Sequence, residues 1–292
     1  MSYNKKKTIR LIYPQWQGGM ISSLVPELTP EDSSKGYYIG AELLSFLAPK
    51  TTQKTLTVPV STEYNRCEIS GVMDRDIIAK QTQDALKLLN DEMPDKILTL
   101  GGDCSVSVVP FTYLANKYKG DVAVIWIDAH PDITLPEDNT YNGYHAMALA
   151  AVMGKGDSKI LSELPCRIEP SNILFVGLRD WERESIKSRQ QEYGIKHLTP
   201  EEVSSNSNKI LEWIEQIGAK NILIHFDMDV LEPSEIVPAV GVVEHGMKIN
   251  EVVRVINDIS NNYNLIALTV AEPMPRIAIK LKNMMEMLPL FE

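Results

Sequence analysis

The stretch of sequence that decides the fold is VAVIWIDAHPD, residues 122–132. Its first six residues are apolar at every position, which is typical of a strand buried between two helix layers of a parallel sheet. An acidic residue follows the strand at once. Two more junctions have this form: KILTL, residues 96–100, runs into GGDCS, and NILIHF, residues 221–226, runs into DMD. We therefore predict that several buried strands end at one polar site.

Similar apolar runs occur along the chain, separated by segments with helical spacing. The runs predict six strands, at Ile9–Tyr13, Lys96–Leu100, Val122–Ile127, Ile173–Val176, Asn221–Phe226 and Leu265–Val270. Helices are predicted at Asp74–Asn90, Pro200–Ile217 and Ile249–Ile259, the second with the polar stretch Ser204–Asn208 inside it and with Thr199 and Glu202 as a capping box. This alternation predicts an α/β fold with a mostly parallel sheet and helices on both faces. Because no repeat or linker interrupts it, we expect a single domain over residues 1–292.

Charge and cysteine usage narrow the class of function. The chain carries 39 acidic and 29 basic residues, which argues against nucleic acid or a membrane surface as a partner. The three cysteines, Cys67, Cys104 and Cys166, are too few and too irregular for a disulfide framework and fit a reduced compartment. The N-terminal segment MSYNKKKTIRLIYP lacks a long apolar core, and no apolar run of about 18 residues occurs. We expect a cytoplasmic protein.

Carboxylates collect where the predicted strands end. Side chains two apart on an extended chain point the same way, so Asp128, His130 and Asp132 share one direction, and Asp227 and Asp229 share another. Four carboxylates beside an imidazole at one sheet edge would repel one another strongly unless a cation neutralised their charge. The pattern predicts a pair of divalent metal ions. This donor set suits Mn²⁺ well, and Zn²⁺, Fe²⁺, Co²⁺ or Ni²⁺ less distinctively, and a metal pair makes hydrolysis the natural chemistry.

The ordered motifs GGDCS, DAHPD, YHAMA, DMDVLEP and AEPMP, which lie between Gly101 and Pro275, resemble those of the ureohydrolases: arginase, agmatinase and formimidoylglutamase. The resemblance implies a three-layer α/β/α sandwich around an eight-stranded sheet, often assembled as trimers or hexamers. It also implies hydrolysis of a guanidino or amidino compound by a metal-bound hydroxide, usually with release of urea.

The resemblance assigns a role to each acid of the two strand-end motifs. Asp128 and Asp227 resemble the carboxylates that bridge the two ions. His130 and Asp229 resemble ligands of one ion, and Asp132 resembles a ligand of the other.

The catalytic pair is also implied by position. His145 lies where the family has an active-site histidine, and we expect it to shuttle protons. Glu272 matches a late glutamate that holds the guanidinium of the substrate.

The predicted substrate pocket differs from that of arginase. Thr134 and Tyr141 stand where arginase uses Asn and Ser to receive the α-carboxylate of the substrate. Asp180 and Glu182, in the segment GLRDWE, match acids that meet the α-amino group. The resemblance therefore implies a small guanidino or amidino substrate without fixing which one.

The main departure from the family is Cys104, which replaces a metal-binding histidine. A thiolate can bind Zn²⁺, Fe²⁺ or Co²⁺, which gives a metal pair with altered preference. The first ion can instead bind weakly or not at all, with Cys104 as a buried packing residue. The alternatives to a urea-releasing enzyme are a metal-poor, non-catalytic binding or regulatory subunit, and a single-metal amidohydrolase.

His225, inside a predicted buried strand, is expected to be a structural imidazole with satisfied hydrogen bonds.

Overall fold

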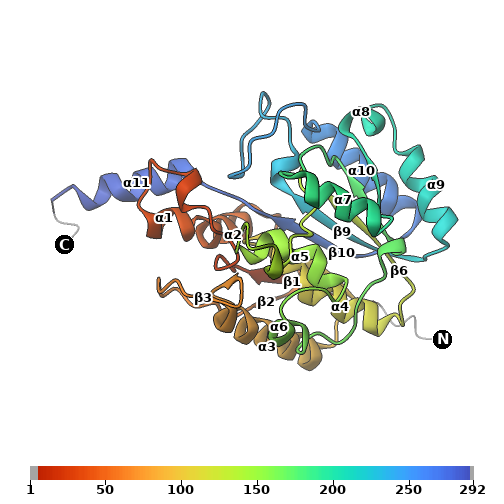
Figure 1. Cartoon of the computed structure of the whole chain (residues 1–292), viewed down its shortest axis with the longest axis horizontal. Helices are drawn as coiled ribbons and strands as arrows, with labels where there is room; N and C mark the ends of the chain where they lie inside the picture. Colours follow the sequence, from red (N-terminus) through yellow and green to blue (C-terminus); the bar gives the residue numbers. More distant parts are fainter. Residues whose placement is uncertain (1–5, 290–292) are drawn as a thin grey trace.

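The computed structural model describes residues 6–289, and a parallel eight-stranded sheet forms its centre (Figure 1). The strand order is β2-β1-β5-β10-β9-β6-β7-β8, and every neighbouring pair is parallel. The sheet strands are β1 (Thr8–Tyr13), β2 (Lys54–Thr57), β5 (Lys96–Gly101), β6 (Val122–Ile127), β7 (Ile173–Val176), β8 (Lys196–Leu198), β9 (Asn221–Asp227) and β10 (Asn264–Ala271). A separate antiparallel pair joins β3 (Glu68–Ile69) to β4 (Val72–Met73). The α/β class and the eight-stranded parallel sheet are confirmed.

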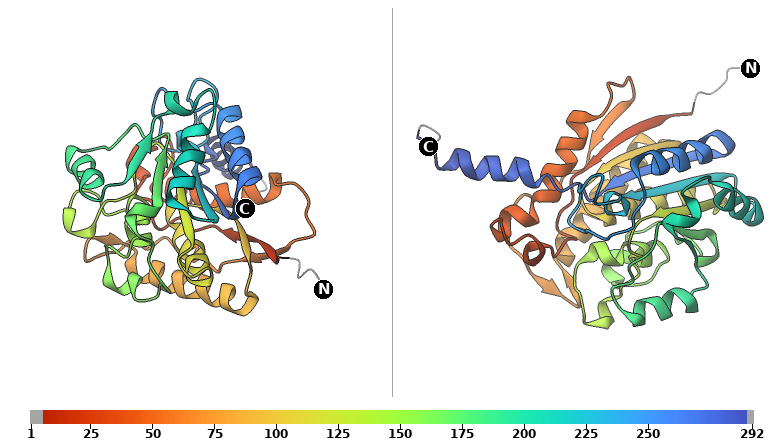
Figure 2. Two further views of the ribbon diagram at one scale, coloured as in Figure 1. Left: turned by 90° about the vertical axis from the view of Figure 1, so that its right-hand side faces the viewer. Right: turned by 90° about the horizontal axis from the view of Figure 1, so that it is seen from above.

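Helices lie on both faces of this sheet, as the two rotated views show (Figure 2). They are α1 (Pro30–Ser34), α2 (Gly36–Leu47), α3 (Arg75–Glu92), α4 (Val108–Lys117), α5 (Ala148–Val152), α6 (Ser158–Leu161), α7 (Glu184–Glu192), α8 (Pro200–Val203), α9 (Asn208–Ile217), α10 (Ile249–Asn262) and α11 (Arg276–Glu286). Short 3-10 turns carry parts of the polar site, among them Cys104–Ser107, Tyr144–Met147 and Met228–Val230.

The central strand β6 shows why the molecule has three layers. Val122, Val124 and Trp126 enter one core, which also contains apolar residues of α3, α4 and α5. The alternate residues Ala123, Ile125 and Ile127 enter a second core with α9 and α10. Each fully buried aliphatic side chain contributes about 1.5–3 kcal/mol. A strand apolar at every position is therefore stable only between two helix layers, which confirms the predicted sandwich.

The six predicted strands all exist, but the two edge strands escaped prediction. β2 and β8 have the sequences KTLT and KHL and are largely exposed to solvent. Each lies at an end of the sheet and pairs with one neighbour. Their polar composition is typical of edge strands and gives no buried apolar run for a sequence pattern to detect.

The prediction of one helix over Pro200–Ile217 is wrong, because the structure has α8, a break at residues 204–207, and then α9. The predicted capping box of Thr199 and Glu202 is present at the start of α8. At the break, the guanidinium of Arg254 in α10 donates to the carbonyl oxygens of Val203 and Ser204. A side chain distant in sequence thus satisfies the carbonyl groups that a continuous helix would use, which no local pattern reveals.

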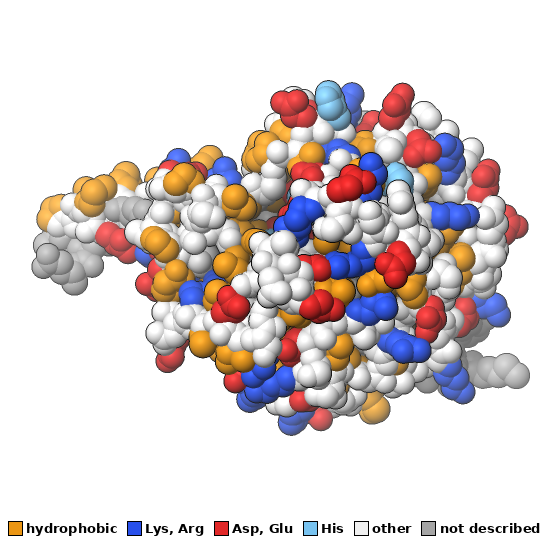
Figure 3. Space-filling model, viewed as in Figure 1, with side chains coloured by type: hydrophobic (Ala, Val, Ile, Leu, Met, Phe, Trp, Pro, Cys, Tyr) orange, Lys and Arg blue, Asp and Glu red, His pale blue; other side chains and the backbone are white. Residues whose placement is uncertain are grey.

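The last described helix, α11, projects away from the rest of the molecule (Figure 1). Its side chains include exposed Ile277 and Leu281. On the face shown in Figure 3, acidic and basic side chains are interspersed, and apolar side chains gather along this projection. Within residues 6–289, none of the helices combines the length and the apolar character that crossing a membrane requires.

Candidate metal centre

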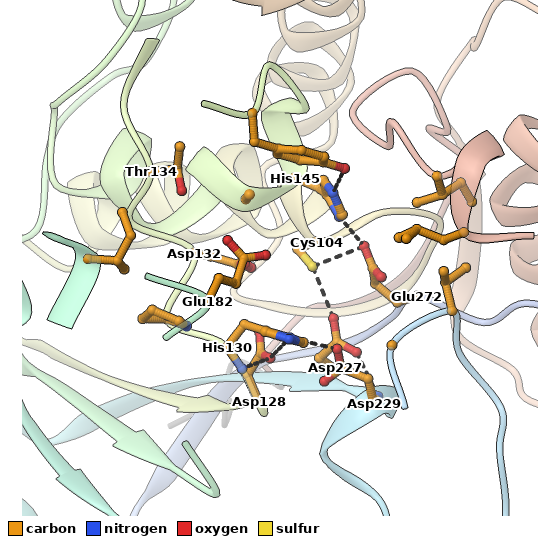
Figure 4. Close-up of a pocket in the computed structure, with 18 of the residues that line it drawn as sticks. Cys104, Asp128, His130, Asp132, Thr134, His145, Glu182, Asp227, Asp229 and Glu272 are labelled. Carbon is orange, nitrogen blue, oxygen red and sulfur yellow. Dashed lines mark hydrogen bonds and ion pairs between the residues drawn. The ribbon is translucent and has the colours of Figure 1, made fainter. Parts of the chain in front are cut away.

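Four neighbouring strands bring the predicted polar residues together at one edge of the sheet (Figure 4). β5, β10, β9 and β6 are consecutive in the sheet, and their carboxyl ends surround a pocket with an empty volume of about 690 Å³. This is where ligands bind in open parallel sheets. Of the residues predicted for the site, the pocket is lined by Cys104, Asp128, His130, Asp132, Thr134, Tyr141, His145, Glu182, Asp227, Asp229 and Glu272.

The chain after β5 is shaped by glycine and by an acidic cap. A Cβ on Gly102 would lie 1.8 Å from the carbonyl oxygen of Gln15, so only glycine fits this approach. Asp103 then caps the following turn, accepting a hydrogen bond from the Ser105 amide at 3.0 Å. The turn begins with Cys104 and directs its thiol toward the other acids (Figure 4).

Three acids of the pocket, Asp132, Glu182 and Glu272, have left-handed backbone conformations, which are strained for residues other than glycine. Asp132 has a φ of 49° and Glu272 a φ of 62°. Each such residue costs of the order of 1–3 kcal/mol. Backbone bonds hold two of them in place: the Asp132 carbonyl accepts from Leu149 and Ala150, and the Glu272 amide donates to Gly102 at 2.7 Å. Strain held in this way is found where function requires a particular side-chain direction.

Besides a group of Cys104, His145 and Glu272, the possible ligand atoms form two groups that share Asp128. In the first, His130 Nδ1 lies 2.9 Å from Asp229 Oδ2 and 3.7 Å from Asp128 Oδ1. The second contains Cys104, Asp128, His225 and Asp227. In each group the ligand atoms lie within 4.8 Å of one another. One carboxylate common to two groups is the arrangement that a pair of ions needs.

The charges of this cluster are not balanced by the protein. Burial, and next the charge on Asp229, raise the pKa of Asp128 to about 7. Burial also raises the pKa values of Asp132 and Asp227 well above the usual range. Although burial opposes it, the positive charge of His130 lowers the pKa of Asp229 to about 2. Carboxyl groups held protonated in this way can exchange their protons for a divalent cation.

An unpaired oxygen of Asp132 also indicates that the acid cluster can take up a divalent cation. Asp132 Oδ2 is buried and has no hydrogen-bond partner in the part of the chain that the structure describes. Leaving a buried acceptor unpaired costs about 1–3 kcal/mol, which a metal ion at this position would remove. The residues present therefore fit a divalent metal pair.

Cys104 is buried, and its thiol belongs to the acid cluster. The Sγ atom donates to Asp227 Oδ2 at 3.0 Å and to Glu272 Oε1 at 3.2 Å (Figure 4). Burial, and next the negative charges around it, raise the pKa of the thiol. In the absence of a cation, the sulfur thus stays protonated, and its single S–H is shared between the carboxyl groups of Asp227 and Glu272.

His145 links the acids to two tyrosines. Its Nδ1 lies 2.7 Å from Glu272 Oε1, and its Nε2 lies 2.6 Å from the hydroxyl of Tyr141. Burial opposes protonation of this imidazole, but Tyr141 and then Glu272 raise its pKa well above the ordinary value. Tyr37, from α2, donates to the other oxygen of Glu272 at 2.5 Å. The network offers a route for a proton between Glu272 and Tyr141.

The residues predicted to bind the substrate are brought together less completely. Thr134 is buried in the pocket wall, and its hydroxyl accepts from Arg183 at 3.4 Å. Glu182 also lines the pocket and lies 3.4 Å from Arg183. Asp180 does not line the pocket: it accepts from the Glu182 amide, and its Oδ2 lies 3.8 Å from His130 Nε2.

Two residues of the site were missed from the sequence. Tyr37 carries no local signal, because it lies in a helix 235 positions from Glu272. His225 was expected to have satisfied hydrogen bonds, yet only Nδ1 has a partner and Nε2 has none. Its position two residues before Asp227 on the same strand is a signal that could have placed both side chains on one side of the sheet.

Comparison with known proteins gives consistent matches. The family model described as the arginase family matches residues 49–287. The arginase of Entamoeba histolytica is 29% identical over 236 residues, covering 78% of this chain and 75% of that protein. The arginase of Plasmodium berghei is 27% identical over 70% of this chain, which spans 61% of the Plasmodium protein. The crystal structure of Entamoeba histolytica arginase in complex with L-ornithine superposes with a TM-score of 0.77, at 22% identity, over 96% of both chains.

Proposed function

This chain belongs to the arginase family, a family of metal-dependent hydrolases of C–N bonds in linear amidines, and we propose that it cleaves a guanidino compound with release of urea, or an amidino compound with release of the corresponding amide. The single observation that carries the proposal is the buried acid cluster, with two ligand groups sharing Asp128. That cluster faces a pocket which also contains the His145–Glu272 pair.

We assign the metal ligands to the two groups. One ion would be held by Asp128, His130 and Asp229, and the other by Asp128 and Asp227 together with neighbouring donors. A bound divalent pair activates water as a nucleophile near neutral pH. The Mn²⁺ identity, the number of ions, the homo-oligomeric assembly, the single domain and the cytoplasmic location stay predictions.

Glu272 is the residue we assign to the cationic end of the substrate. Its carboxylate is buried at the pocket and accepts from Tyr37, His145 and Cys104. A guanidinium is planar and presents several N–H donors, which match a carboxylate in charge and geometry. Substrate binding would replace these internal donors with those of the guanidinium.

His145 is the residue we assign to proton transfer. The leaving amine must gain a proton, and an imidazole within hydrogen-bond distance of the acid that holds the substrate is placed to supply it. Tyr141 lies on the far nitrogen at 2.6 Å and can return a proton to it.

The residues that we assign to the non-reacting end of the substrate determine which guanidino compounds can bind. The Entamoeba enzyme was crystallised with L-ornithine, an α-amino acid, and Thr134, Tyr141, Asp180 and Glu182 hold the corresponding positions in our assignment. The Tyr141 hydroxyl already accepts from the Met20 amide and contacts His145. It is therefore less free to receive a carboxylate, and we propose arginine as one candidate among guanidino compounds.

The test is a panel of guanidino and amidino compounds assayed for urea and ammonia after reconstitution with Mn²⁺, Zn²⁺ or Co²⁺. We expect urea release from at least one compound and its loss in Asp229→Asn. Asp258→Asn is the matched control, because Asp258 contacts Ser207 in the helix layer and leaves the pocket intact. No turnover of any compound with any of the metals would contradict the proposal and favour the non-catalytic alternative.

A further inference from the structure

His225 is a buried histidine whose outer nitrogen lacks a partner. The residue lies in β9 with no exposure to solvent. Its ring stacks on Trp126, with centroids 3.7 Å apart and planes 10° apart, so the ring orientation is fixed. Nδ1 lies 2.7 Å from the Ser107 hydroxyl, while Nε2 has no hydrogen-bond partner among residues 6–289. Leaving a buried nitrogen unpaired is unfavourable, so a ligand on Nε2 would stabilise the site.

The atoms around Nε2 are those of a metal site. Asp128 Oδ2 lies 3.8 Å from it. Cys104 Sγ and an oxygen of Asp227 complete a group in which all four ligand atoms lie within 4.8 Å of one another. All four residues are buried. The group brings together one sulfur, one imidazole nitrogen and two carboxylates.

The surrounding contacts orient these donors. When Nδ1–H donates to the Ser107 hydroxyl oxygen, Nε2 carries the lone pair that a metal ligand needs, an arrangement common in metal-binding histidines. The indole N–H of Trp126 donates to Asp128 at 2.9 Å. Asp227 accepts the Asp229 amide on Oδ1, which leaves Oδ2 free to face Cys104.

We propose that His225 is a metal ligand, and that Cys104, Asp128, His225 and Asp227 together form a site selective for Zn²⁺ or Co²⁺ over Mn²⁺. It deepens the metal site of the proposed function and rests on it. Cys104 stands where the family has a ligand histidine, and the imidazole reaches the group from β9 instead of from the turn after β5. Zn²⁺ favours four-coordinate sites of nitrogen and sulfur, whereas a thiolate is a poor ligand for Mn²⁺.

X-ray absorption at the zinc edge tests this directly. The metal-free full chain is given one equivalent of Zn²⁺, and the spectrum reports the ligand shells. We expect one sulfur at about 2.3 Å together with imidazole. A spectrum without sulfur, or with sulfur but no imidazole, would overturn the proposal. Because this measurement uses the wild-type chain, it does not depend on any variant folding.

Zn²⁺ titration of His225→Asn measures the contribution of the imidazole. We expect the affinity for Zn²⁺ to fall about 100-fold or more. Removing a residue that only hydrogen-bonds to a metal ligand already lowers affinity about 10- to 100-fold. His197→Asn is the matched control, since His197 is exposed in the edge strand β8, and we expect its affinity to be that of the wild type. Equal affinities for wild type and His225→Asn would refute the assignment.

A double-variant comparison separates this inference from the proposed function. In Cys104→His, which restores the family residue, we expect Mn²⁺ binding to rise and His225→Asn to cost much less affinity than in the wild-type background. If His225→Asn has no effect in either background while Asp229→Asn still abolishes metal binding, only the His225 inference fails. If Asp229→Asn leaves metal binding and turnover intact, the proposed function fails as well.

Discussion

Replacing Trp126 with phenylalanine should destabilise the metal-free protein in a pH-dependent way. Trp126 is fully buried, and its indole N–H donates to Asp128 Oδ2 at 2.9 Å. Loss of a hydrogen bond to an ionised carboxylate costs about 1.5–3 kcal/mol. The smaller ring leaves a cavity that costs about 1 kcal/mol more. At pH 8 we expect a loss of about 2.5–4 kcal/mol in the free energy of unfolding.

At pH 5 the loss should be smaller, about 1.5–2.5 kcal/mol, because a bond to a neutral carboxyl contributes only about 0.5–1.5 kcal/mol. Burial, and next the charge of Asp229, raise the pKa of Asp128 to about 7, above its unfolded value. A carboxyl with a raised folded pKa binds more protons in the folded state, so its ionisation removes stability as the pH rises. The substitution raises that pKa further. The difference in the free energy of unfolding between wild type and variant must therefore increase as the pH rises through 7.

The measurement is urea unfolding followed by far-ultraviolet circular dichroism, with a chelator present, at pH 5 and pH 8. Trp213→Phe is the matched control, because Trp213, a residue of α9, is buried in the second core away from the acid cluster. Its destabilisation should be the same at both pH values. An equal loss in the free energy of unfolding at pH 5 and pH 8 for Trp126→Phe would refute the reasoning.

Three further substitutions have expected outcomes. Glu272→Gln should lower kcat/KM about 10- to 100-fold by removing a charged partner of the substrate, and an unchanged value in the urea assay would rule out the assignment. Tyr141→Phe should lower the pKa of His145 and shift the pH profile of kcat/KM toward acid, because Tyr141 helps to raise that pKa; an unmoved profile would exclude His145 as the titrating group. Gly40→Ala should cost about 1–3 kcal/mol in urea unfolding, since its Cβ would lie 1.8 Å from the Pro273 carbonyl oxygen, and an unchanged midpoint would contradict this.

The interior of the sheet could be predicted from the sequence because burial on both faces leaves a strong local pattern. β6 is apolar at every position, and its end is marked by Asp128. The edge strands lack this pattern because solvent covers one side. The break before α9 depends on Arg254, which is distant in sequence. Local periodicity describes what a segment buries, not which distant side chain satisfies its backbone.

Those residues of the candidate site that lie at strand ends could be predicted from the sequence, and those brought in by the tertiary structure could not. Asp128, Asp227 and Glu272 follow strands, so the topology of a parallel sheet places them at one edge. Tyr37 comes from α2, and only the tertiary structure brings it to Glu272. His225 was interpreted from burial alone, although burial does not tell whether both ring nitrogens have partners.

The position of β10 has a consequence for synthesis on the ribosome. β10 follows every other sheet strand in the sequence, yet it lies between β5 and β9, and within residues 6–289 it is the strand that joins β2-β1-β5 to β9-β6-β7-β8. A nascent chain that has not yet released Asn264–Ala271 holds two half-sheets, each with an unpaired edge. Cys104 belongs to one half, and Asp128 and Asp227 to the other. A site that takes donors from both halves is therefore complete only after β10 has emerged and paired with β5 and β9, whereas Asp128, His130 and Asp229 all lie in one half.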